Sequence, residues 1–253
     1  MGLTLKENLV TVDHSHNNWL VTTPARNPTV EIYNGLIIYS VFKRRKTSGK
    51  QQRDRALRQL GDNCPIIYAL KGKEGLITDF SSIKKLNVSF KTIIKYISAL
   101  EPQGYQVVIS VPSTHNISHI IGKRFSKHFR SIHLKNVLRK ITIQEAFNLL
   151  DREDINLEES KSLRFRIKKQ YKEVGFQGFF SLKGVPTLYR DLLPPLSMNV
   201  RPQLTFTPDR ILIVDDLLAS GTTLETAAKI IQNLYPNAMI HAACLFSSIG
   251  LRT

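Results

Sequence analysis

Three short apolar runs constrain the fold of this chain more than any other feature. They cover residues 106–111, 210–215 and 238–246. Continuous apolar runs of this length are typical of strands that are buried on both faces of a sheet. The segments between them, residues 117–129 and 223–234, place apolar side chains near helical spacing. This alternation predicts an α/β fold with a mainly parallel central sheet flanked by helices.

The first 60 residues differ from the rest of the chain. Residues 19–22 and 31–42 are β-like, and a strongly basic segment over residues 43–58 follows them. We therefore expect an N-terminal β-containing extension with a basic segment over residues 1–60, and one α/β domain over residues 61–253.

Four further segments of that domain have a recognisable pattern. Residues 83–100 are expected to be helical, and residues 175–182 are strand-like. Residues 191–207 form a Pro-rich connection. Residues 140–175 are polar and highly charged, which favours a long mobile excursion.

Positive charge is in large excess and is clustered. The chain has 36 Lys and Arg against 20 Asp and Glu, a formal net charge of +16, and the bases gather in residues 43–58, 105–144 and 161–172. Segment 43–58 is either a solvated face or a surface that contacts phosphates, of a nucleic acid or of a small polyanion. If a nucleic acid or a ribonucleoprotein binds there, the contacting residues are expected to be Lys43, Arg44, Arg45, Lys46, Lys50 and Arg53.

Several classes of protein are excluded. The two cysteines, Cys64 and Cys244, are far apart and have no His or Cys at metal-ligand spacing, which excludes a zinc ribbon and a disulfide framework. No residues are predicted to form a metal site of their own. No apolar run reaches the roughly 18 residues of a membrane helix, so we expect a cytoplasmic protein without membrane contact. An oligomer is compatible with the sequence.

One segment carries the chemistry of the chain. Residues 211–224 read ILIVDDLLASGTTL, a buried strand followed by two adjacent acids, a small-residue loop and a helix. Asp215 and Asp216 would lie at the carboxyl end of the strand, where open α/β folds bind ligands. Gly221 allows a tight turn, and the hydroxyls around it lie beside backbone N–H groups at a helix N-terminus, as in a phosphate site. Acids beside an anion site suit a ligand that has both a phosphate and a diol.

This segment resembles the 5-phosphoribosyl-1-pyrophosphate (PRPP) motif of type I phosphoribosyltransferases. The resemblance implies that Asp215 and Asp216 hold the ribose 2′ and 3′ hydroxyls as the catalytic acids. It implies that the 5-phosphate is bound by the loop residues Ala219, Ser220, Gly221, Thr222 and Thr223.

Other segments resemble the same family in the same order. Residues 107–116, VVISVPSTHN, are similar to the strand and loop that bind pyrophosphate, which implies a role for Pro112, Ser113 and Thr114. Residues 66–72, IIYALKG, and the helix through Arg124 are similar to segments of the ComF-like branch. Residues 140–175 fall where the family has its flexible catalytic loop. The chain departs from the family in lacking the cysteine zinc module of ComF relatives and in having Ala219 where purine-specific members have an Asp.

Two functions follow from the resemblance and the charge. One is a phosphoribosyltransferase that binds PRPP and Mg²⁺ and transfers phosphoribosyl to an unidentified acceptor. The alternative is a non-catalytic protein that senses PRPP or a nucleotide while bound to nucleic acid or a ribonucleoprotein, in a bacterial competence or anti-phage defence system.

Overall fold

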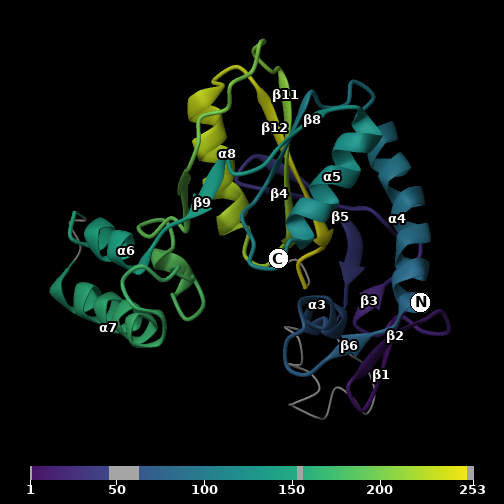
Figure 1. Ribbon diagram of the computed structural model, residues 1–253, viewed down its shortest axis with the longest axis horizontal. Coiled ribbons are helices and arrows are strands. Elements are labelled where there is room, and N and C mark those ends of the chain that lie inside the picture. Colours follow the sequence, from purple (N-terminus) through teal and green to yellow (C-terminus); the bar gives the residue numbers. More distant parts are fainter. Residues whose placement is uncertain (1, 46–62, 153–155, 250–253) are drawn as a thin grey trace.

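The computed structural model describes residues 2–45, 63–152 and 156–249, and its centre is a seven-stranded, mostly parallel sheet. The strand order is β3-β5-β12-β11-β7-β8, with β4 paired to β5 (Figure 1). Strands β5, β12, β11, β7 and β8 run parallel to one another, while β3 and β4 are antiparallel to β5. The strands are β3 (Leu20–Val21), β4 (Thr29–Tyr33), β5 (Leu36–Arg44), β7 (Val107–Ser110), β8 (Ile132–Leu134), β11 (Arg210–Leu217) and β12 (Met239–Phe246).

Helices cover both faces of this sheet. Helices α4 (Phe80–Leu100) and α5 (Ile117–Phe129) pack on one face, and α8 (Thr222–Leu234) packs on the other. Alternate residues of β11 therefore join different cores: Leu212 belongs to the α4/α5 side and Ile213 to the α8 side. The predicted α/β fold class is confirmed.

The N-terminal residues contribute to two parts of the molecule. Strands β1 (Gly2–Lys6), β2 (Leu9–Asp13) and β6 (Ile77–Thr78) form a small sheet that contacts α3 (Pro65–Lys71), in the lower part of Figure 1. The β4–β5 hairpin instead extends the central sheet, because β5 pairs with β12.

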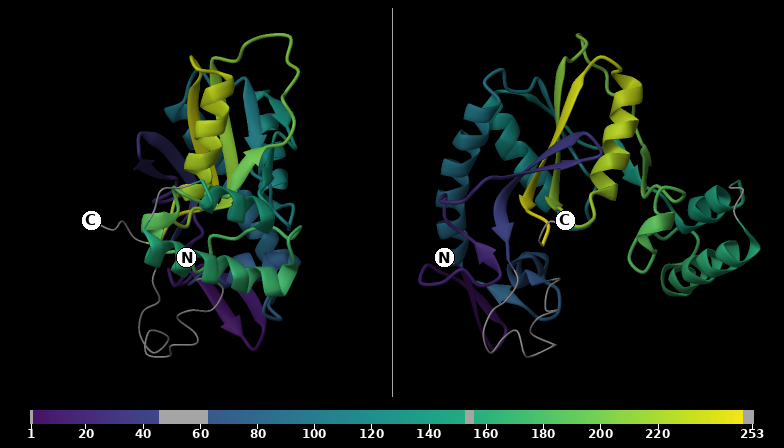
Figure 2. Two further views of the ribbon diagram at one scale, coloured as in Figure 1. Left: turned by 90° about the vertical axis from the view of Figure 1, so that its left-hand side faces the viewer. Right: turned by 180° about the vertical axis from the view of Figure 1, so that it is seen from behind.

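The segment between β8 and β11 forms a unit that projects from the sheet, as Figure 2 shows. It contains β9 (Leu138–Lys140), α6 (Ile143–Leu150), α7 (Leu157–Val174), the 3-10 helix η2 (Thr187–Tyr189) and β10 (Leu196–Met198). We call this unit, residues 138–198, the insert. Its own apolar core consists of Ile141, Ile143, Ala146, Leu150, Leu163, Ile167, Phe180, Val185 and Leu193.

The insert corrects two expectations. Residues 140–175 are mostly helical, because Thr142 caps α6 through a reciprocal bond pair with Glu145, and Asn156 accepts a hydrogen bond from the Glu159 N–H at the start of α7. The expected strand at residues 175–182 is absent: there the structure has a single bridge between Thr142 and Phe179.

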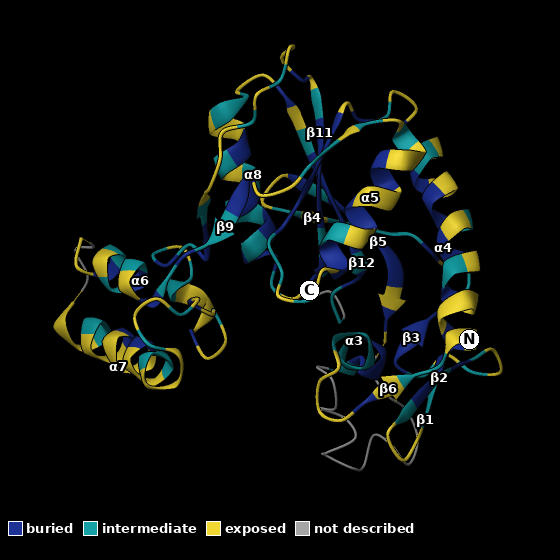
Figure 3. Cartoon of the chain, in the orientation of Figure 1, coloured by how far each residue is buried: buried dark blue, intermediate teal, exposed yellow. Residues whose placement is uncertain are grey.

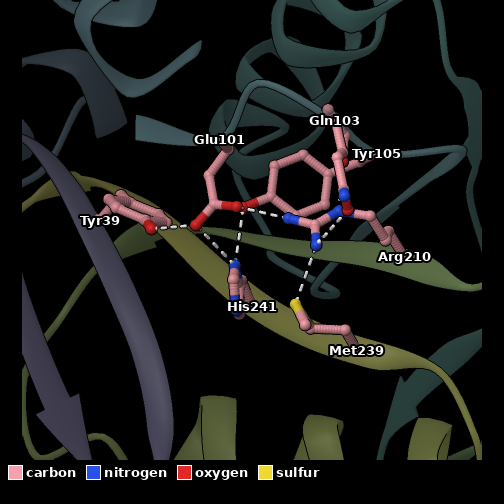
Figure 4. A network of polar contacts seen from close by, with 8 residues as sticks. Tyr39, Glu101, Gln103, Tyr105, Arg210, Met239 and His241 are labelled. Atoms are coloured by element: carbon pink, nitrogen blue, oxygen red, sulfur yellow. Dashed lines mark hydrogen bonds and ion pairs between the residues drawn. The ribbon is translucent and has the colours of Figure 1, made fainter. Parts of the chain in front are cut away.

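A buried polar network lies near the amino ends of β11 and β12 (Figure 4). Glu101, at the end of α4, receives hydrogen bonds from Tyr39 and Arg210, and its carboxylate lies 3.1 Å from Nδ1 of His241. Tyr105 Oη is 2.9 Å from the same histidine nitrogen. The network ties α4 to three strands of the sheet.

None of the helices in the described ranges is long and apolar enough to span a membrane.

Candidate functional site

The strand order reverses at the carboxyl ends of β7 and β11. These strands are neighbours, yet β7 connects through α5 to β8 on one side while β11 connects through α8 to β12 on the other. Ligands of open α/β sheets bind at such reversals of strand order. Two loops, residues 111–116 and 218–221, begin there, and the Val111 N–H donates to the Val214 carbonyl at 2.9 Å.

Asp215 lies at this reversal and has few partners. Its Oδ1 accepts hydrogen bonds from Ser118 Oγ at 3.0 Å and from the Asp216 N–H at 2.7 Å. Burial and then the negative charge of Asp216 raise the pKa of Asp215 to about 7. A carboxyl group held in this way costs stability in its ionised form, which is typical of a functional position.

Asp216 is paired with a lysine from a distant part of the chain. Lys71 Nζ lies 2.7 Å from Asp216 Oδ2, and the two side chains are only 16% and 9% exposed. Lys71 is the last residue of α3, which begins with Pro65 and is followed by Gly72, a cap in the left-handed conformation. The pairing places the end of α3 over the carboxyl end of β11.

Further cations surround the two acids. Burial lowers the pKa of Lys140 on β9, while the charges of Asp215 and Asp216 act to raise it. Burial and the charges of Lys73 and Lys71 lower the pKa of His115. This edge of the sheet therefore combines two carboxylates with several cations, a set suited to a polyanion that also carries hydroxyl groups.

The loop before α8 needs glycine at one position. Gly221 has φ of 81°, and a Cβ on it would lie 3.0 Å from the ring of Tyr33. It is the N-cap of α8, and no side chain caps that helix end. The Arg44 guanidinium holds the start of the loop by donating a hydrogen bond to the Leu218 carbonyl at 3.0 Å. The backbone N–H groups of the first turn are thus held at the carboxyl edge of the sheet.

The structure brings the predicted phosphate and pyrophosphate residues to one edge of the sheet. In the loop before α8, Ala219 is exposed, Ser220 and Thr223 are half-buried, and Gly221 and Thr222 are buried. In the loop after β7, Pro112 and Ser113 are half-buried and Thr114 is exposed. Their assignment to a ligand stays a prediction.

The cations of α3 and β9 were missed by the sequence reasoning. Lys71 lies in the segment IIYALKG that was compared with ComF-like proteins, so a signal for it existed. Lys140 had no local signal, because only the fold of the insert brings it near Asp215.

One predicted partner residue of the basic segment is placed differently from the expectation. Arg44 is only 5% exposed and donates to the carbonyls of Leu218 and Ser247. Its assignment to a nucleic-acid surface is therefore wrong, because β5 is the neighbour of β12 in the sheet and turns this side chain inward. Lys43 and Arg45 are exposed. Lys46, Lys50 and Arg53 lie outside the described residues.

The donor set at the carboxyl end of β11 fits Mg²⁺ only as a partner of a ligand. Within residues 2–45, 63–152 and 156–249, no group of three or more His, Cys, Asp and Glu side chains converges. Asp215 and Asp216 are the acids at hand, and Asp216 is paired with Lys71. Mg²⁺ is commonly held by one or two carboxylates together with substrate phosphates, which these residues allow.

Comparison with known proteins agrees with this geometry. Residues 201–250 match the family described as the phosphoribosyl transferase domain. This match supports the assignment of the chain to the type I phosphoribosyltransferase family. The match spans β11, the loop and α8, and it indicates phosphoribosyl transfer in general terms. The ComF-like branch stays a prediction.

Two other comparisons add no argument. The crystal structure of TT1426 from Thermus thermophilus is 15% identical, covers 62% of this chain and 80% of that chain, and has a TM-score of 0.28. A TM-score this low does not show a shared fold. No curated protein matches the chain.

Proposed function

We propose that this protein binds PRPP together with Mg²⁺ at the carboxyl end of β11 and transfers its phosphoribosyl group to an acceptor. One observation carries the proposal: two adjacent acids and a glycine-containing loop at a helix N-terminus lie at the reversal of strand order. The match of residues 201–250 supports it.

The 5-phosphate is assigned to the loop of residues 219–223. The N–H groups at the start of α8 lack a side-chain cap, and a helix N-terminus favours an anion. Glu225, the acid in the first turn, is paired with Lys229 at 2.9 Å and accepts a hydrogen bond from Asn34 at 3.0 Å. Its charge therefore opposes a bound phosphate less than a free carboxylate would.

The ribose diol is assigned to Asp215 and Asp216. A carboxylate accepts hydrogen bonds from hydroxyl groups, and such charge-assisted bonds contribute about 1.5–3 kcal/mol each. Ser118 and Lys71 hold the two carboxyl groups in place while the hydroxyls approach the remaining lone pairs.

The pyrophosphate is assigned to the loop of Pro112, Ser113 and Thr114, with the nearby cations Lys71 and Lys140. These cations favour the negative charge that develops as pyrophosphate leaves C1 of the ribose. Mg²⁺, when bound to PRPP, supplies further neutralisation of that charge. The protein's part is mainly to position the ribose and to stabilise charge, since no nucleophile or general base is assigned.

Calorimetry with PRPP, with and without Mg²⁺, tests the proposal. We expect saturable binding that Mg²⁺ strengthens, followed by pyrophosphate release when the correct acceptor is added from a panel of nucleobases, nucleotides and short oligonucleotides. Binding without pyrophosphate release for any acceptor would favour the alternative, a non-catalytic sensor of PRPP or a nucleotide. Absence of PRPP binding would contradict both the proposed transferase and a sensor of PRPP.

A further inference from the structure

The outer face of α7 carries an exposed aromatic ring among lysines. Leu163 and Ile167 point into the core of the insert, and Phe165 lies on the opposite side of the helix, where it is 73% exposed. At 3.6 residues per turn, the positions four before and three, four and seven after Phe165 share its face. These positions are Lys161, Lys168, Lys169 and Lys172, and all four are exposed.

Glu158, an exposed acid seven residues before Phe165, lies on the same face of α7, but none of the four lysines is paired with it. The arginines of α7 have partners: Arg164 pairs with Asp151, and Arg166 donates to the Gly184 carbonyl. In the part of the chain that the structure describes, the four lysines make no ion pair. The face therefore presents a cationic strip about 17 Å long, from Lys161 to Lys172, with Phe165 within it.

Figure 3 shows that this helix lies at the outside of the insert, with much of its surface exposed. A large apolar ring exposed among cations is a poor arrangement for solubility alone, because lysines separated by polar residues would serve that purpose. Aromatic rings stack on unpaired bases, and lysines bind the adjoining phosphates.

We propose that the outer face of α7 binds single-stranded nucleic acid, with Phe165 stacking on a base and Lys161, Lys168, Lys169 and Lys172 contacting phosphates. The proposal does not rest on the phosphoribosyltransferase activity. It also places the contact surface away from the basic segment 43–58.

Helix α4 provides a matched control. Lys84, Lys91 and Lys95 have the same spacing as Lys161, Lys168 and Lys172, and all are exposed. At the position that corresponds to Phe165, α4 has Val88, which is 60% exposed. The two faces thus share three lysines, and α4 has Val88 in place of Phe165 and Thr92 in place of Lys169.

Fluorescence anisotropy with labelled oligo(dT) and oligo(U), at about 50 mM salt, tests the proposal on the full chain. We expect Phe165→Ala to weaken binding by roughly five- to a hundredfold, since base stacking is lost, and Phe165→Tyr to retain it. The variant Lys161→Glu/Lys168→Glu/Lys172→Glu should weaken binding more than tenfold and reduce the log–log salt slope by about 2, at roughly 0.7 per contact.

The matched variants decide the outcome. Lys84→Glu/Lys91→Glu/Lys95→Glu and Val88→Ala should change affinity by less than about twofold. Equal losses on α4 and α7 would mean attraction by net charge alone and would overturn the proposal. So would unchanged affinity of Phe165→Ala, or binding only to duplexes or to phosphatidylserine vesicles. Because every substituted side chain is exposed, circular dichroism should show folded variants throughout.

Discussion

Carboxyl groups lie near both ends of β11, and their surroundings differ in kind. At the amino end, Glu101 has Tyr39, Arg210 and His241 around it, all close in space and all part of the sheet or its border (Figure 4). At the carboxyl end, Asp215 has Ser118 and a backbone N–H.

The contacts at the two ends differ in how far they stabilise the fold. At the amino end, Arg210 of β11 pairs with Glu101 at the end of α4, so this contact joins the helix to the sheet. Burial and a second acid oppose the ionisation of Asp215, and the cation paired with Asp216, Lys71, comes from α3, outside the central sheet. A site arranged in this way sacrifices stability that a ligand can restore.

The largest expected effect is at the amino end. Arg210→Met should lower the free energy of unfolding by about 3–5 kcal/mol, because it leaves Glu101 buried without its cation. Urea denaturation measures the change, and Arg190→Met serves as a control arginine that makes no ion pair with any described residue. A loss below about 1 kcal/mol would remove the contrast between the two ends.

A smaller effect is expected at the loop before α8. Gly221→Val should lower the free energy of unfolding by roughly 2–4 kcal/mol. The backbone at this position is left-handed, which strains a residue with a Cβ, and the added Cβ would lie in tight contact with the ring of Tyr33. Gly184→Val is the matched control, because Gly184 has φ of 83° and no atom within 4 Å of the added Cβ. Urea denaturation should show the smaller loss for Gly184→Val, and PRPP binding should be lost only in Gly221→Val. Equal losses would exclude the Tyr33 contact as a cause.

The pH dependence of stability tests whether the ionised form of Asp215 destabilises the fold. Because the pKa of Asp215 is raised above its usual 3.8, the folded protein binds more protons than the unfolded chain between about pH 4 and pH 7. Its contribution to stability therefore falls as the pH rises through that window. Asp215→Asn should raise Tm by roughly 2–8 °C near pH 8, corresponding to about 1–2 kcal/mol, and leave it unchanged near pH 4. A lower Tm at pH 8 would show that the ionised group stabilises the fold.

The smallest effect is expected in the insert. Arg164 and Asp151 form an ion pair in which both side chains are about half exposed, at 47% and 51%. Solvent screens such a pair, so Arg164→Ala should cost less than about 1 kcal/mol in urea denaturation. A loss as large as that of Arg210→Met would mean that burial does not govern these contributions.

The central strands of the sheet were predictable from the sequence because they are covered on both faces and are therefore apolar throughout. The apolar runs at residues 106–111 and 210–215 correspond to β7 and β11, and helix α5 begins and ends at the expected residues. Both faces of these strands are covered, so their pattern does not depend on distant contacts.

The insert was not predictable in the same way. Only Leu163 and Ile167 of α7 are buried, and this narrow stripe is hidden among charged residues. Thr142 and Glu145 have the spacing of a capping box and indicate a helix start. The high polarity of the segment nevertheless favoured the prediction of a mobile excursion. The acids of the candidate site were expected from the motif, whereas Lys71 and Lys140 reach it only through folding.

The affinity of Asp215→Asn/Asp216→Asn for PRPP tests the central claim most directly. Calorimetry in the presence of Mg²⁺ should show a loss of about 2–4 kcal/mol relative to the unsubstituted protein, from two charge-assisted hydrogen bonds that are not fully additive. Asp209→Asn, which changes an exposed acid just before β11, should bind PRPP normally. Unchanged affinity of the double variant would contradict the assignment of the carboxyl end of β11 as the ribose site.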